Sequence, residues 1–178
     1  MTLAEFLAWE ERQELRYEFD GFHPIAMVGG TRAHASIQAN LAIAVGGRLR
    51  GTPCRYYGND LKVEVAGRIR YPDGFVTCTP GAGRDTVERE PVVIFEVLSE
   101  GTQRTDWTVK NDEYRATPSV RRYVILDQEA VRATVFAREG EEWLGRILSL
   151  GDILAMPEIG ISVLLDELYE GVSFSAAP

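Results

Sequence analysis

The sequence predicts an α/β or α+β fold in which helices flank a mixed β-sheet. Three observations lead to this prediction. Helix-like patterns come first, apolar strand-like runs fill the middle of the chain, and one further helix lies between the runs PVVIFEVL (91–98) and RRYVILD (121–127). At 178 residues, 45% of them hydrophobic, the chain can build a substantial core, and we expect a single domain over residues 1–178.

An N-terminal helix, a β-hairpin and a long helix are the first predicted elements. TLAEFLAWEER (2–12) begins with Thr2 three residues before Glu5, which is the spacing of a capping box. LRYEF and HPIAMV flank Asp20-Gly21, a strong turn signal, and predict the hairpin. TRAHASIQANLAIAVGGRLR (31–50) keeps its apolar residues at helical spacing behind Thr31 and predicts the long helix.

The rest of the chain is predicted to be mostly strands. CRYYG, DLKVEVA and IRYPDGFVTC (69–78) predict successive strands, and PVVIFEVL is typical of a strand covered on both faces. DWTVKNDEYRAT (106–117) predicts a helix that ends before Pro118. RRYVILD, VRATVFAR and EWLGRILSL predict further strands, and VLLDELYEG (163–171) predicts a short closing helix.

The cysteines and the hydropathy of the chain indicate its compartment. Cys54 and Cys78 form no CxxC pair and lie near no histidine cluster, so we expect neither a disulfide framework nor a zinc site. A reducing cytoplasm fits this pattern best. We also expect no membrane span and no secretory leader, because no long apolar run occurs.

The charge of the chain bears on nucleic-acid binding. A net charge of −8 makes a protein a poor non-specific binder of polyanions. A local basic groove could still lead DNA to Asp73 if a group of cations shares one face, and the alternative is a solvated strand face. These cations are Arg48, Arg50, Arg55, Lys62, Arg68 and Arg70.

Two acids interrupt apolar strands and are the main candidates for a functional site. Asp73 lies in IRYPDGFVTC and Glu96 in PVVIFEVLSE. A buried unpaired charge costs several kcal/mol, on the order found in real proteins, so each acid needs a partner, a metal or a raised pKa. Pro72 belongs at an edge or a bulge, where side chains are often re-aimed. If the two strands are neighbours, both carboxylates can share one cleft with a divalent cation, and such hard oxygen ligands suit Mg²⁺.

Each acid also has a simpler explanation. Asp73 could cap a turn after its proline. Glu96 is expected on the same sheet face as Ile94 and Leu98, where it could pair with a structural arginine such as Arg70 or Arg122.

A set of short motifs, spread from about residue 2 to 171, carries a family resemblance. They include Arg16-Tyr17-Glu18, His34, Gly58 with Asp60, Pro72-Asp73, Glu96-Val97-Leu98-Ser99, Thr105-Asp106 with Lys110 and Tyr114, Pro118-Ser119-Val120 and Tyr123 to Asp127. Together they resemble the Uma-two family of restriction-endonuclease-like proteins, within the PD-(D/E)XK nuclease superfamily. The resemblance implies a mixed sheet core flanked by helices, a Mg²⁺-dependent site with Mn²⁺ as a substitute, and DNA as the substrate.

The resemblance also implies roles for individual residues. Asp73 and Glu96 would be metal ligands, with the Val97 carbonyl as a third protein oxygen. Where the superfamily has a lysine two residues after the glutamate, this chain has Leu98, and Lys110 occupies the matching place on the following helix.

Lys110 is expected to share a helical face with Asp106 and Tyr114. It could orient the attacking water or stabilise charge on the phosphorane, and the alternative is an ordinary exposed pair with Asp106. Tyr114 is expected in the core.

Two further positions match the family. Glu18 would be an accessory acid that orders the site, or else a solvent-facing strand residue. His34, at the start of the long helix, could help to hold a phosphate, or it could be a satisfied or exposed side chain.

We therefore expect a Mg²⁺-dependent endonuclease that hydrolyses DNA phosphodiester bonds, with Asp73, Glu96, Lys110 and Glu18 as catalytic residues. The alternative is a catalytically inactive nuclease-fold module that binds nucleic acid or a protein partner. Cutting both strands at one place requires two sites, and a two-fold homodimer would supply them.

Overall fold

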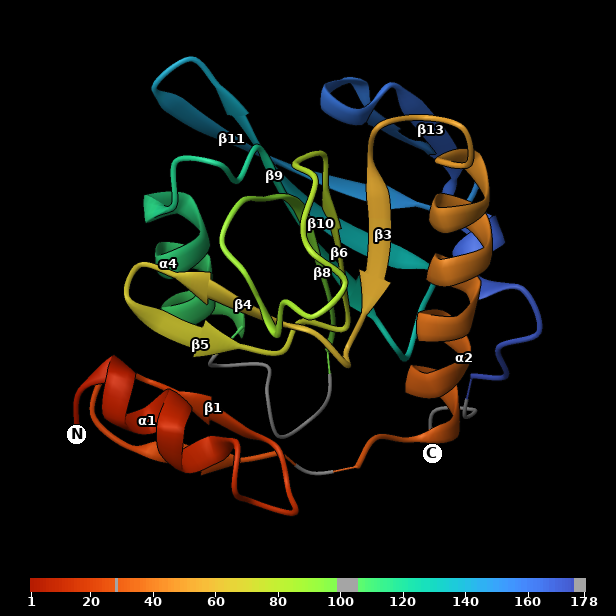
Figure 1. The fold of residues 1–178 in the computed structure, drawn as a ribbon. Coiled ribbons are helices and arrows are strands. Elements are labelled where there is room, and N and C mark those ends of the chain that lie inside the picture. The colour runs from red at the N-terminus through yellow and green to blue at the C-terminus, as the bar shows by residue number, and fades with distance from the viewer. Residues whose placement is uncertain (28, 99–105, 175–178) are drawn as a thin grey trace.

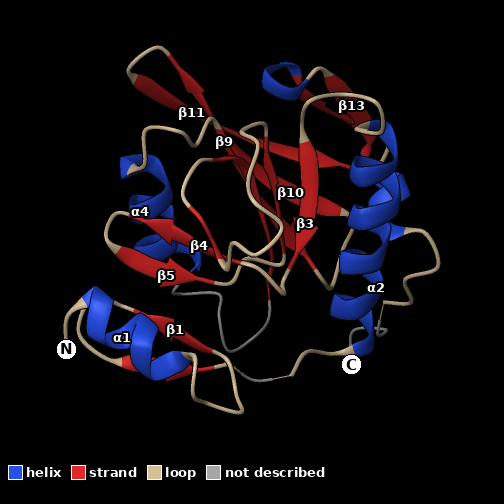
Figure 2. Ribbon diagram, in the orientation of Figure 1, coloured by secondary structure: helices blue, strands red, loops and turns tan. Residues whose placement is uncertain are grey.

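The computed structural model describes residues 1–27, 29–98 and 106–174 and places the strands in three sheets (Figures 1 and 2). The largest sheet has the order β11-β10-β9-β8-β6-β3, a second has the order β2-β1-β5-β4-β7, and β12 pairs with β13. The strands of the largest sheet are β3 (Arg55–Gly58), β6 (Gly74–Thr77), β8 (Pro91–Leu98), β9 (Arg122–Asp127), β10 (Arg132–Glu139) and β11 (Glu142–Ser149). The others are β1 (Tyr17–Phe19), β2 (Pro24–Ala26), β4 (Lys62–Val65), β5 (Arg68–Arg70), β7 (Val87–Glu88), β12 (Ile153–Met156) and β13 (Ile161–Leu164).

The six-stranded sheet is mixed and has helices on both faces, as the sequence predicts. β8 runs parallel to β9 and antiparallel to β6. Alternate residues of β8 point to opposite faces: Phe95 packs in the core cluster that includes residues of α2 (Arg32–Leu41), and Ile94 packs in the cluster that includes α4 (Asn111–Ala116). Figure 1 shows these two helices on opposite sides of the sheet.

The helices begin largely where the sequence predicts. Thr2 and Glu5 form the capping box of α1 (Leu3–Glu10), and the Thr31 hydroxyl accepts the His34 N–H at the start of α2. π-helical turns extend α2 at Ala42–Gly46 and precede α4 at Asp106–Lys110. In residues 1–27, 29–98 and 106–174, no helix is long and apolar enough to cross a membrane.

IRYPDGFVTC does not form one strand. Its first part ends β5 in the five-stranded sheet and its last part forms β6 in the six-stranded sheet, so Tyr71-Pro72-Asp73 crosses between the two. Pro72 has no N–H to donate, which ends the pairing of β5 and frees the chain to change direction. The crossing places Asp73 directly before β6.

The closing segment also differs from the expected short helix. Leu164 is part of β13, opposite Ile153 of β12, and only Leu165–Tyr169 is helical, as a 3₁₀ turn. The pairing of β13 with β12, the strand just before it, overrides the local helical pattern at the start of this segment. A second 3₁₀ turn, Pro157–Ile159, connects the two strands.

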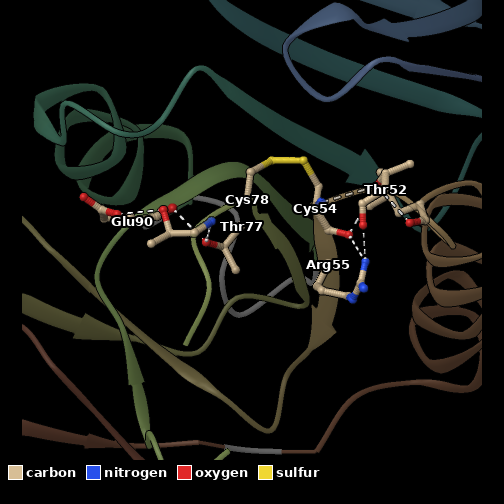
Figure 3. Close-up of a disulfide and its surroundings, with 8 residues drawn as sticks. Thr52, Cys54, Arg55, Thr77, Cys78 and Glu90 are labelled. Carbon is tan, nitrogen blue, oxygen red and sulfur yellow. Dashed lines mark hydrogen bonds between the residues drawn. A yellow bond between two sulfur atoms is a disulfide. The ribbon is translucent and has the colours of Figure 1, made fainter. Parts of the chain in front are cut away.

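Cys54 and Cys78 form a disulfide (Figure 3), so the expectation that the chain carries none was wrong. β3 and β6 are antiparallel, with Arg55 opposite Thr77. One step beyond this pair, the two cysteines face each other. The bond removes the cysteine argument for a reducing cytoplasm, because disulfides persist mainly in oxidising compartments.

Reducing this disulfide is expected to lower the free energy of unfolding by about 3 kcal/mol, because it closes a loop of 24 residues in the unfolded chain. The Cys54→Ser/Cys78→Ser double variant should show the same loss. Urea unfolding with and without a reductant measures it, with thiol titration to establish the redox state. Equal midpoints for the oxidised and reduced proteins would contradict the expectation.

Candidate active site

Asp73 is fixed at the start of β6 by side-chain contacts to α2 and β8. The β6–β8 pairing ends at Gly74 opposite Phe95, so one further step brings Asp73 level with Glu96. Its Oδ2 accepts the Val97 N–H at 2.6 Å. This contact runs to another strand and not to the turn after Pro72, so the turn-cap explanation of Asp73 is wrong.

The long helix contributes two side chains to Asp73. Gln38 donates from Nε2 to Asp73 Oδ1 at 2.6 Å, and His34 Nε2 lies 3.3 Å from Asp73 Oδ2. These two residues are four apart on α2 and therefore share one face of the helix. His34 is a satisfied side chain, and its partner is the candidate metal ligand itself.

Glu96 is buried in β8, with 4% of its surface exposed, and it is partnered as the burial cost requires. Its Oε1 accepts a hydrogen bond from Lys110 Nζ at 3.0 Å and another from the Tyr114 hydroxyl at 2.8 Å. Neither Arg70 nor Arg122 is the main partner, because these arginines bind Glu113 and Glu158. Burial raises the pKa of Tyr114 well above its ordinary value, and the charge of Glu96 raises it further, so the phenol remains a donor.

Glu18 connects the hairpin to this centre. Its Oε1 accepts the Tyr71 N–H at 3.2 Å and lies 3.4 Å from Lys110 Nζ, while its Oε2 lies 3.3 Å from an Arg70 nitrogen. With 13% of its side chain exposed, Glu18 is not the solvent-facing strand residue that was the alternative. The ammonium of Lys110 therefore contacts both Glu96 and Glu18.

Arg70 and Glu113 form a buried ion pair beside the site, and Arg70 also contacts Glu18. Arg70 is 1% exposed and donates from Nε and a terminal nitrogen to the two oxygens of Glu113, both at 2.7 Å. Such a bidentate pair has a fixed geometry. It holds β5, which leads into Tyr71 and Asp73, against α4, which carries Tyr114.

The position of Lys110 follows from the local structure around it. Leu98, two residues after Glu96, is buried in the cluster with Ile94 and Tyr114, so a charged side chain there would enter the apolar core. Lys110 closes the π-helical turn before α4, and such turns are frequent at functional sites. The Asp106 side chain lies outside the described residues, so its predicted alignment with Lys110 stays a prediction.

The six cations considered for a basic groove do not share one exposed face. Lys62 and Arg70 are buried, and several of the other cations are bound by acids or by backbone carbonyls. Lys62 pairs with Glu10, Arg48 with Glu167 and Arg68 with Glu113, and Arg55 donates to the carbonyls of Thr52 and Cys54. Four of the six cations therefore neutralise carboxylates of the chain: Arg48, Lys62, Arg68 and Arg70.

The donor set fits an ion that keeps most of its water. In the described part of the chain, no three His, Cys, Asp or Glu side chains are grouped as ligands of one metal ion. Asp73 and Glu96 offer carboxylate oxygens, each of which can accept more than one interaction. Mg²⁺ is usually held by one or two carboxylates together with waters and substrate phosphates, so two protein carboxylates suit it.

Sequence reasoning missed Gln38 and Glu113 and undervalued His34. The i,i+4 spacing of His34 and Gln38 was a usable signal, because it places both on one helical face. Glu113 follows Asp112 on a short helix and carries no local sign that it would be buried. Only the position of Arg70 in the folded chain reveals its role.

Solved structures show the same fold. The crystal structure of "a putative nuclease belonging to DUF820 from Anabaena variabilis" superposes with a TM-score of 0.79 over 96% of this chain and 98% of that chain. The two sequences are only 15% identical, so the likeness concerns the fold. It confirms the predicted nuclease-like mixed sheet with flanking helices.

Two proteins of Synechocystis sp. (strain PCC 6803) are similar to this chain in sequence. "Uncharacterized protein slr1290" is 30% identical, over 98% of this chain and 94% of that protein, and "Uncharacterized protein sll1609" is 25% identical over 81% and 85%. The family model Uma2, described as "Putative restriction endonuclease", matches residues 3–164. Since this match covers most of the chain, the protein belongs to the Uma2 family.

Proposed function

We propose that this protein is a Mg²⁺-dependent endonuclease that hydrolyses DNA phosphodiester bonds. The observation that carries the proposal is that Asp73 binds the N–H of Val97, the residue after Glu96, at the paired ends of β6 and β8, while Lys110 binds Glu96. Membership of a family described as "Putative restriction endonuclease" and a nuclease-like fold support the reaction class.

In this proposal Asp73, Glu96 and the Val97 carbonyl hold the metal ion. The N–H and C=O of one strand residue point to the same side, so the Val97 carbonyl is directed toward Asp73, as its N–H is. A bound Mg²⁺ or Mn²⁺ would act as a Lewis acid and supply an activated water. His34 and Gln38 orient the Asp73 carboxylate, as outer residues of metal sites commonly do.

Lys110 and Glu18 act on the substrate side of the site. The Lys110 ammonium donates toward developing charge on the phosphorane, where a fixed positive group stabilises the transition state. Glu18 holds Lys110 and the Tyr71 amide, and so positions the lysine and the approach to Asp73.

The test is cleavage of supercoiled plasmid and of a short duplex oligonucleotide with MgCl₂, with MnCl₂ and with excess EDTA. We expect nicked and linear products with either metal and none with EDTA. Equal cleavage in EDTA, or no cleavage at any metal concentration, would contradict the proposal.

The alternative is a catalytically inactive nuclease-fold module that binds nucleic acid or a protein partner. The net charge of −8 and the ion-paired state of most of the candidate groove cations favour it. A module of this kind would bind without metal, and its thermal stability would not respond to Mg²⁺ or Mn²⁺.

The plasmid assay also bears on the oligomeric state of the protein. A homodimer would bring two sites to opposite strands, so linear product without accumulated nicked plasmid would favour it. A cytoplasmic location stays a prediction, and the Cys54–Cys78 disulfide removes the cysteine argument for it.

A further inference from the structure

We propose that the Lys110 ammonium occupies a cation position of the active site, between Glu96 and Glu18, and that a divalent ion binds by displacing Lys110 from Glu96. The inference rests on the proposed function, because it concerns how the same site admits its metal. It assigns Lys110 a second role, as an internal counter-ion of the metal-free protein.

The Lys110 ammonium lies where a cation bound by two carboxylates would lie, in contact with both Glu96 and Glu18. Lys110 Nζ lies 3.0 Å from Glu96 Oε1 and 3.4 Å from Glu18 Oε1. The side chains of Lys110, Glu96 and Glu18 are 7%, 5% and 13% exposed. Two carboxylates removed from water in this way require positive charge between them.

Lys110 is the cation that can leave. The guanidinium of Arg70 is committed to Glu113 by two hydrogen bonds of 2.7 Å and packs almost without exposure. Lys110 instead carries a point charge on a flexible four-carbon stem, at the end of a π-helical turn. Its side chain can therefore swing without breaking the bidentate pair.

Electrostatic repulsion favours the displacement. A divalent ion that binds Glu96 brings two positive charges close to an ammonium that already lies 3.0 Å from the same carboxylate. Like charges at such separations repel strongly in a site shielded from water. This repulsion drives the ammonium away from Glu96, and in the proposed reaction the substrate phosphate would be a new acceptor for it.

The chain contains its own control. It has two lysines, Lys62 and Lys110, and both are buried and paired with a glutamate that also accepts a tyrosine hydroxyl. Lys62 pairs with Glu10 between α1 and β4, and in the described residues no second carboxylate lies within ion-pair distance of it. The two lysines thus share burial and chemistry but differ in their relation to the site.

The first experiment is NMR of the unmodified protein with labelled lysine side chains, titrated with Mg²⁺. Two lysine signals are expected, and Lys62→Arg assigns them. Mg²⁺ should shift the Lys110 signal and leave the Lys62 signal in place. This readout needs no substrate and no variant of the site.

The second experiment is calorimetric titration of Mg²⁺ and Mn²⁺ into the parent, Lys110→Gln and Lys62→Gln. We expect Lys110→Gln to bind either ion about tenfold more tightly, because the competing ammonium is gone, and Lys62→Gln to match the parent. If Lys110→Gln does not fold, the NMR titration decides.

The outcomes separate this inference from the proposed function. Metal binding that depends on Asp73 but leaves the Lys110 signal unmoved would overturn the displacement and leave the nuclease proposal intact. Absence of metal binding in both the parent and Lys110→Gln, together with absence of cleavage, would overturn both.

Discussion

Replacing Arg70 by methionine is expected to lower the free energy of unfolding by about 3–5 kcal/mol. Arg70 is 1% exposed and binds both oxygens of Glu113, and it also lies 3.3 Å from Glu18. Methionine fills much of the same volume but leaves Glu113 buried without its main cation. The cost therefore comes from a buried carboxylate that loses its bidentate partner and keeps the more exposed Arg68 at 3.0 Å. Urea unfolding of the parent and the variant measures it.

Two variants test the cause of that loss. Arg48 also binds its partner, Glu167, through both carboxylate oxygens, but these side chains are 38% and 36% exposed, so Arg48→Met should cost less than about 1 kcal/mol. The double variant Arg70→Met/Glu113→Leu should recover much of the stability, because it removes both buried charges. Equal losses for Arg70→Met and Arg48→Met would show that burial of the pair is not the cause.

Local signals in the sequence were sufficient for most of the secondary structure. The Thr2–Glu5 capping box and the Asp20-Gly21 turn depend on residues a few positions apart, and both are present in the fold. PVVIFEVL forms β8, because its apolar character, interrupted only by Glu96, matches a strand covered on both faces.

Features that depend on the order of strands could not be predicted. Cys54 and Cys78 meet only because β3 pairs with β6, and nothing near either residue indicates that pairing. IRYPDGFVTC contributes to two sheets because Pro72 interrupts pairing, and the sequence does not reveal which strand lies beside each half. The disulfide was missed because only local cysteine motifs were considered, and the strand was not divided because the whole segment reads locally as one strand.

The two acids of the candidate site could be predicted from the energetic cost of burying a charge. An acid in an apolar strand is costly, so Asp73 and Glu96 stood out, and the structure brings both to the ends of paired strands. Lys110 could be chosen only through the family resemblance, since its helix offers no other sign. The partners Gln38 and Glu113 stayed hidden because a polar residue on a helix is ordinary until its face is known to meet a buried acid.

The second large effect concerns the two acids. Asp73→Asn and Glu96→Gln are each expected to reduce Mg²⁺-dependent cleavage on the order of 10³-fold, because a neutral amide is a poor ligand for a hard cation and each change removes a carboxylate. The shapes of the side chains are retained. In Asp73→Asn the amide oxygen can still accept the Val97 N–H, and in Glu96→Gln it can still accept from Lys110 or Tyr114. Rates should be compared at equal concentrations of folded protein, established by thermal unfolding.

Glu158→Gln is the matched control for these variants. Glu158 is a partly buried acid with a cationic partner, Arg122, as Glu96 has Lys110, but it lies at the opposite end of the sheet, where β9 begins. This variant should keep the parental rate and lose only modest stability. If Glu158→Gln lowered cleavage as much as Glu96→Gln, the loss would reflect general damage to the fold. If neither Asp73→Asn nor Glu96→Gln lowered it, these two acids would not form the nuclease site, because among the described residues the neighbouring acids Glu18 and Glu113 are already bound by Arg70.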